Sequence, residues 1–169
     1  MLKQLFMAIL IILLLLATPE GAPRASRRPD SQSQYPESPS ITWGRKDAFS
    51  TYSQDFATMA QAYGSNNLQY EIAMELAAIS ARAYERIDSA ETILFLYRGT
   101  VASPQHEACR SRVLEWLSAA SNVARIDVDG TQTNLTFTSK PGMAVQAQRM
   151  KEDLQDSRRW LDRARDAIQ

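Results

Sequence analysis

A seven-residue repeat of apolar and small residues at the C-terminal end of the chain constrains the fold more than any other feature. Its members alternate in steps of four and three: Met143, Ala147, Met150, Leu154, Ser157, Leu161, Ala164 and Ile168. This spacing places them on one side of an α-helix, as in helices that pack lengthwise against other helices. The repeat therefore predicts a long C-terminal helix that packs against helices of the same chain or against a second copy of the chain.

Two helices are predicted before residue 100. Apolar residues at steps of three and four predict a first helix that ends at Gly64: Phe49, Tyr52, Phe56, Met59 and Tyr63. A second helix is expected over residues 68–98, because the same spacing continues there until Gly99 ends the run. Asn66 or Asn67 lies directly before it and can accept hydrogen bonds from its first amides.

A third helix is predicted to begin at Ser103 and Pro104, because proline is suited to the first helical position. It is expected to end between residues 122 and 124. Asp88 and Glu91 resemble a capping box, which leaves open a division of the second helix into two. The expected buried face of the third helix consists of Cys109, Val113, Trp116, Leu117, Ala120 and Val123.

Residues 126–137 alternate between apolar and polar side chains, which is typical of a strand. The apolar members of this alternation are Ile126, Val128, Leu135 and Phe137. Asp129 and Gly130 stand between the two halves, and an Asp-Gly pair in this position predicts a β-hairpin. Because a two-stranded hairpin is marginal alone, we expect it to pack against the helices or to pair with another segment. The predicted fold is mainly α, an antiparallel bundle of three or four helices with one short β-hairpin.

The apolar run of residues 5–17, which follows Lys3, predicts an export or anchoring segment. Its length is that of a signal-peptide core and falls short of the about 20 residues that a membrane span needs. Residues 1–22 are therefore predicted to be a signal peptide or an uncleaved N-terminal anchor, with residues 1–18 as a possible membrane tether. The expected localisation is extracytoplasmic, either periplasmic or secreted, or anchored to the membrane.

Two features keep cleavage and anchoring both open. Only Ala17 offers a tolerable cleavage site, and Arg24, Arg27 and Arg28 follow the run, where positive charge favours retention on the cytoplasmic side. Residues 23–42 are rich in proline, serine and arginine, and they cannot bury enough apolar surface to fold, so they are predicted to be a flexible linker. The helical bundle domain is expected at residues 43–169.

Composition excludes several classes of function. Nineteen Lys and Arg residues balance nineteen Asp and Glu residues, so no net charge favours nucleic acid. One cysteine and one histidine exclude a disulfide framework and most sites that use several such residues. The chain is therefore not expected to be an enzyme, to bind a nucleic acid, or to hold a cofactor or a metal.

His106 and Cys109 are the pair of residues closest to a catalytic arrangement. They lie three residues apart on one helical face and could form a thiol-imidazole pair. A nucleophilic cysteine also needs oxyanion donors, and no glycine-rich turn accompanies this pair. A buried thiol beside a histidine of the first helical turn is the simpler interpretation. Asn134 begins an Asn-Leu-Thr glycosylation pattern, which applies only to a chain exported in a eukaryote.

Two groups of acidic residues resemble parts of metal sites. Glu71 and Glu75 could form half of a carboxylate site in a helical bundle, but they also suit the N-terminal end of a helix. Asp127, Asp129 and Gly130 resemble the start of a calcium-binding loop, but the glycine is fourth instead of sixth, so a hairpin turn explains them better.

The function expected from these features is that of an exported or membrane-tethered helical accessory or adaptor protein that binds another protein. With no assembled catalytic set, the amphipathic helical faces are the features suited to recognition. A structural protein that associates with itself through the C-terminal heptad helix is the first alternative. A small extracytoplasmic enzyme is the second.

Overall fold

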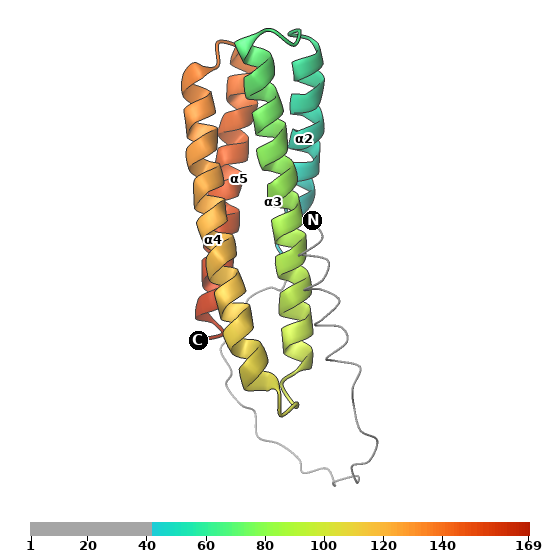
Figure 1. The fold of residues 1–169 in the computed structure, drawn as a ribbon, viewed down its shortest axis with the longest axis vertical. Helices are drawn as coiled ribbons and strands as arrows, with labels where there is room; N and C mark the ends of the chain where they lie inside the picture. The colour runs from blue at the N-terminus through green and yellow to red at the C-terminus, as the bar shows by residue number, and fades with distance from the viewer. Residues whose placement is uncertain (1–41) are drawn as a thin grey trace. The chain divides into compact units, whose positions relative to one another are not determined.

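The computed structural model describes residues 42–169, which form four helices and no strand. They are α2 (Lys46–Gln61), α3 (Leu68–Gly99), α4 (His106–Phe137) and α5 (Pro141–Asp166), and they lie side by side in an up-and-down order (Figure 1). The prediction of a mainly helical fold is confirmed. The predicted signal or anchor and nearly all of the predicted linker lie outside the described residues. Within residues 42–169, no helix has the length and hydropathy needed to cross a membrane.

The helices pack as two hairpins around one shared core. α2 packs along α3, α4 packs along α5, and α3 contacts α4, whereas α5 meets α2 and α3 at fewer points. α2 is half as long as α3, so it covers only part of that helix (Figure 1). The largest fully buried apolar side chains come from all four helices: Phe49, Phe56, Leu76, Ile79, Ile87, Leu117, Met143, Met150, Leu154 and Leu161.

The heptad repeat of α5 packs inside the chain. Every member from Met143 to Ala164 is buried, and Ile168 packs against the edge of the core. The prediction of a long C-terminal helix is therefore confirmed, and the neighbours of its apolar face are α2, α3 and α4 of the same chain. In this fold the repeat is not an exposed seam for a second copy.

α3 is one continuous helix, as the undivided alternative predicted. The Asn67 side chain caps it by accepting a hydrogen bond from the Gln69 amide at 2.9 Å. Asp88 and Glu91 do not cap a new helix, because both carboxylates bind the Lys46 ammonium at 2.8 Å. The hydrogen bond to Asp88 and, to a lesser extent, the hydrogen bond to Glu91 raise the pKa of Lys46 above its usual value.

The predicted β-hairpin at residues 126–137 is wrong, and so is the predicted end of the third helix at residues 122–124. α4 continues to Phe137 and passes through Gly130 without a turn. The buried residues of this stretch have helical spacing but polar side chains: Asp127, Thr131 and Asn134. The apolar alternation that suggested strands instead leaves Ile126 and Phe137 each 59% exposed. Because the buried face of this part of α4 is polar, its sequence resembles that of a β-hairpin.

The start of α4 and its buried face also differ from the prediction. The helix begins at His106, and Ser103 Oγ accepts a hydrogen bond from the Gln105 amide in the preceding turn at 3.2 Å. Val113, Leu117 and Ala120 are buried as expected, whereas Val123 is 42% exposed.

Candidate functional site

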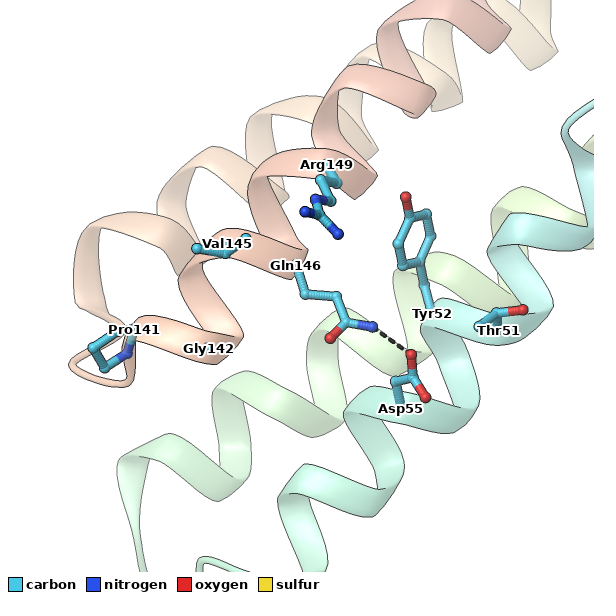
Figure 2. A pocket seen from close by; sticks show the side chains of 8 residues that line it. All are labelled: Thr51, Tyr52, Asp55, Pro141, Gly142, Val145, Gln146 and Arg149. Carbon is cyan, nitrogen blue, oxygen red and sulfur yellow. Dashed lines mark hydrogen bonds between the residues drawn. The ribbon is translucent and has the colours of Figure 1, made fainter.

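A groove of about 610 Å³ lies between α2 and α5 in the described part of the chain (Figure 2). It is open because these two helices contact each other at few points. Val145 is 55% exposed on its wall and lies outside the packed heptad face of α5. The lining residues are Thr51, Tyr52 and Asp55 from α2, and Pro141, Gly142, Val145, Gln146 and Arg149 from α5.

A hydrogen bond between Gln146 and Asp55 crosses the groove (Figure 2). The amide nitrogen of Gln146 donates to the Asp55 carboxylate, so the one acidic side chain of the groove already has a polar partner. On one side of this crossing the lining consists of Pro141, Gly142 and Val145 and is apolar. Gly142 has no atom within 4 Å of the place where a Cβ would lie, so a larger residue there would extend into open space.

On the other side of the crossing, the side chains of Arg149 and Tyr52 both extend into the space between α5 and α2 (Figure 2). Arg149 forms no ion pair with a carboxylate of residues 42–169, although most arginines of α5 do. Its charge is therefore available in the groove beside the apolar wall. A guanidinium in this position can bind a carboxylate with two parallel hydrogen bonds.

Asp153 lies one helical turn after Arg149 on α5 and binds Tyr52, which lines the groove. The Tyr52 hydroxyl donates to its Oδ2 at 2.9 Å, and Arg45 Nη1 donates to its Oδ1 at 2.7 Å. Asp153 is only 8% exposed, so these two bonds satisfy a buried charge. Burial, followed by the hydrogen bond to Asp153, raises the pKa of Tyr52 to about 12.

Replacement of Tyr52 by phenylalanine is expected to lower the free energy of unfolding by about 1.5–3 kcal/mol at pH 7, because one hydrogen bond to a charged acceptor is lost. The folded protein binds the phenolic proton more tightly than the unfolded chain, whose tyrosine pKa is about 10. The contribution of Tyr52 is therefore fully present below about pH 10 and is lost as the pH rises toward 12. Urea unfolding between pH 8 and 11 measures both effects.

Tyr70→Phe is the matched control for this experiment, because the Tyr70 side chain is also half-buried against the core but its hydroxyl has no hydrogen bond within residues 42–169. Tyr70→Phe should lose stability at alkaline pH as the unsubstituted protein does, whereas Tyr52→Phe should lose less. Equal behaviour of the two variants would contradict the assigned role of Tyr52.

His106 and Cys109 both lie on α4, but the His106 imidazole bonds to residues other than Cys109. His106 Nε2 lies 3.1 Å from the Tyr97 hydroxyl, and Nδ1 lies 3.0 Å from the Thr100 hydroxyl. Because the Thr100 hydroxyl donates to the Tyr97 carbonyl at 2.7 Å, it accepts from Nδ1, and Tyr97 donates to Nε2. Both nitrogens therefore fasten the turn between α3 and α4, and neither orients the thiol.

The structure does not bring the other candidate residues together. Glu71 and Glu75 are both exposed on α3, and no group of three potential metal-ligating side chains forms within the described residues. Asp127 binds Arg86 and is buried, whereas Asp129 is exposed and pairs with Arg125 on its own helix.

Asn134 is also unsuited to the role that its sequence pattern suggested. It is 6% exposed, and its amide donates to the Gly130 carbonyl within α4. In the folded chain the glycosylation pattern is therefore not presented on the surface.

Sequence interpretation missed the groove. One indication was available, because Val145 is an apolar residue of α5 that lies outside the heptad repeat. Pro141 is the first residue of α5, where proline loses no helical hydrogen bond. Comparison with models of protein families, with curated proteins and with solved structures finds no match to this chain.

Proposed function

We propose that this chain is an exported or membrane-tethered accessory protein that binds a protein partner in the groove between α2 and α5. The observation that carries the proposal is the exposed Val145 beside Arg149, which lacks an ion-pair partner, in an open groove between two helices. An apolar wall with one available charge supplies both contact area and orientation to a bound segment. The proposed localisation outside the cytoplasm or at the membrane rests on the apolar run of residues 5–17.

The expected occupant is a short segment of the partner that carries an apolar side chain near a carboxylate. The apolar side chain would lie against Val145 and Pro141, and the carboxylate would reach Arg149. Asp55 would not repel it strongly, because the Gln146 amide already binds that carboxylate. Two α-helices that form an open groove can accept a third helix or an extended segment between them.

Site-specific photo-crosslinking tests this proposal on the full chain in its native cells. A photoreactive amino acid in place of Val145 is expected to link one defined partner. The same amino acid in place of Ile126 should not, although Ile126 is 59% exposed and apolar on α4. Arg149→Glu and Gly142→Phe should each remove most of the crosslink from position 145, because one reverses the charge and the other fills the groove.

Arg163→Glu is the matched control for Arg149→Glu, because Arg163 is an exposed arginine of the same helix outside the groove. It should leave the crosslink unchanged. A crosslink that Arg149→Glu and Arg163→Glu affect equally, or that forms only from position 126, would exclude the groove. A product with the mass of two chains would favour self-association instead.

A further inference from the structure

The end of the hairpin formed by α3 and α4 carries a run of apolar residues that the bundle covers only on one side. The run occupies the last turns of α3 and consists of Ile93, Leu94, Phe95, Leu96 and Tyr97. Leu94 is buried, whereas Phe95 is 67% exposed and Val101 in the following turn is 69% exposed. A helix that is apolar on all sides normally lies in a protein core or in a lipid environment. Residues 92–105 are called the hairpin tip below.

The hairpin tip is uncovered because α2 begins too far along α3 to reach it. The Trp43 amide donates to Glu91 at 2.8 Å, and Lys46 binds Glu91 and Asp88, which fixes the start of α2 beside that turn of α3. α3 continues to Gly99 and α4 returns from His106, so the hairpin tip extends beyond α2 (Figure 1). Phe95 follows Glu91 by one helical turn, on the side of α3 that α2 would otherwise cover.

Basic residues lie at and beside the hairpin tip. Arg98 is its one charged residue, and Arg110 and Arg112 follow in the first turns of α4. Arg110 is already engaged, because it pairs with Glu107 and donates to the carbonyls of Ile168 and Gln169. Arg112 is exposed and forms no ion pair within residues 42–169. Exposed aromatic and aliphatic side chains with arginines around them fit the interface of an anionic bilayer, where apolar groups enter the acyl boundary and cations meet the headgroups.

We infer that the hairpin tip lies on an anionic lipid surface and inserts Phe95 and Val101 into it. The inference rests on the tethering part of the proposed function and not on the groove. The chain joins the bundle beside Glu91, about 12 Å along α3 from its end at Gly99. A flexible linker of the proposed length has a root-mean-square end-to-end distance of about 25 Å, so a membrane that holds residues 1–18 would lie within reach of the hairpin tip.

Tryptophan quenching by brominated lipids tests the inference on the full chain. The chain is reconstituted in vesicles of phosphatidylcholine and phosphatidylglycerol, with brominated or ordinary acyl chains. Phe95→Trp and Val101→Trp are expected to add emission that falls to about half in brominated vesicles, because bromine quenches only indoles that reach the acyl region. Phe137→Trp is the matched control, because Phe137 is 59% exposed at the opposite end of the bundle and should show no added quenching.

The outcomes separate the two proposals. Quenching at position 137 equal to that at 95 and 101, or no added quenching at either tip position, overturns the inference. Blue-shifted but unquenched emission at position 95 also overturns it, because protein then covers the hairpin tip. Cosedimentation of the unsubstituted chain with vesicles reports anchoring separately. If the chain does not cosediment, the tethering proposal fails, and absence of quenching with added anionic vesicles overturns the inference as well.

Discussion

Replacement of Asp127 by alanine is expected to lower the free energy of unfolding by about 3–5 kcal/mol, one of the two largest effects in the molecule. Asp127 is 3% exposed and binds Arg86 Nη1 at 2.6 Å, and the Arg86 side chain is itself 7% exposed. Loss of the carboxylate would leave a buried guanidinium without a counterion. Arg82 also binds the Asp127 carboxylate, at 3.2 Å. Because Arg82 is itself a cation, it cannot serve as a counterion for Arg86.

Asp129→Ala is the matched control for Asp127→Ala. It lies two residues further along α4 and pairs with Arg125 on the helix surface, where both side chains are more than half exposed. Its removal should change the free energy of unfolding by less than about 0.5 kcal/mol. Equal effects of the two substitutions in urea unfolding would show that Asp127 is not in a buried pair.

A double replacement separates the pair from its surroundings. Arg86 Nε and Nη2 are buried without a hydrogen-bond partner within residues 42–169, so the ion pair already contains unsatisfied donors. Arg86→Met combined with Asp127→Leu should therefore recover most of the stability that Asp127→Ala loses, because an apolar pair of similar volume has no buried charge to satisfy. A double variant less stable than Asp127→Ala would contradict this account.

The same ion pair explains why sequence analysis found three helices correctly and failed on the second half of α4. Where buried residues are apolar, as in α5, helical spacing is visible in the sequence alone. In α4 the buried positions after Ala124 hold Asp127, Thr131 and Asn134, and the partner of Asp127 is Arg86, 41 residues earlier in the chain. No local pattern can show that a charged residue will be buried. The exposed apolar residues therefore suggested the two-residue period of a strand in a segment that is helical.

The groove and the hairpin tip depend on contacts between distant segments. The groove lies between α2 and α5, next to the hydrogen bonds that join Asp153 to Tyr52 and Arg45. These two residues are 101 and 108 residues from Asp153 in sequence. The hairpin tip is uncovered because Lys46 meets Asp88 and Glu91 and thereby sets where α2 begins. Sequence periodicity predicts which side of a helix is buried, but not how far a neighbouring helix extends along it.

The heptad repeat of α5 leads to the other large effect. Leu154→Asp is expected to destabilise the fold by about 5 kcal/mol or more, because Leu154 is fully buried among apolar neighbours and an aspartate there would bring an unpaired carboxylate into the core. Domains of this size are stable by about 5–15 kcal/mol, so a domain near the lower end of this range would be largely unfolded by the substitution. A protein that used the repeat as an interface between copies would instead dissociate into folded monomers.

Far-UV circular dichroism and the mass in solution distinguish these outcomes. Leu154→Asp should lose its helical signal together with its cooperative unfolding transition. Val145→Asp makes a similar chemical change on the same helix, but its position is 55% exposed, so that variant should keep its helices. A folded monomer of Leu154→Asp beside an oligomer of the unsubstituted chain would contradict the packing of the repeat within one chain. Such a result would restore self-association through α5, because only a seam exposed in the monomer can accept the charge without unfolding.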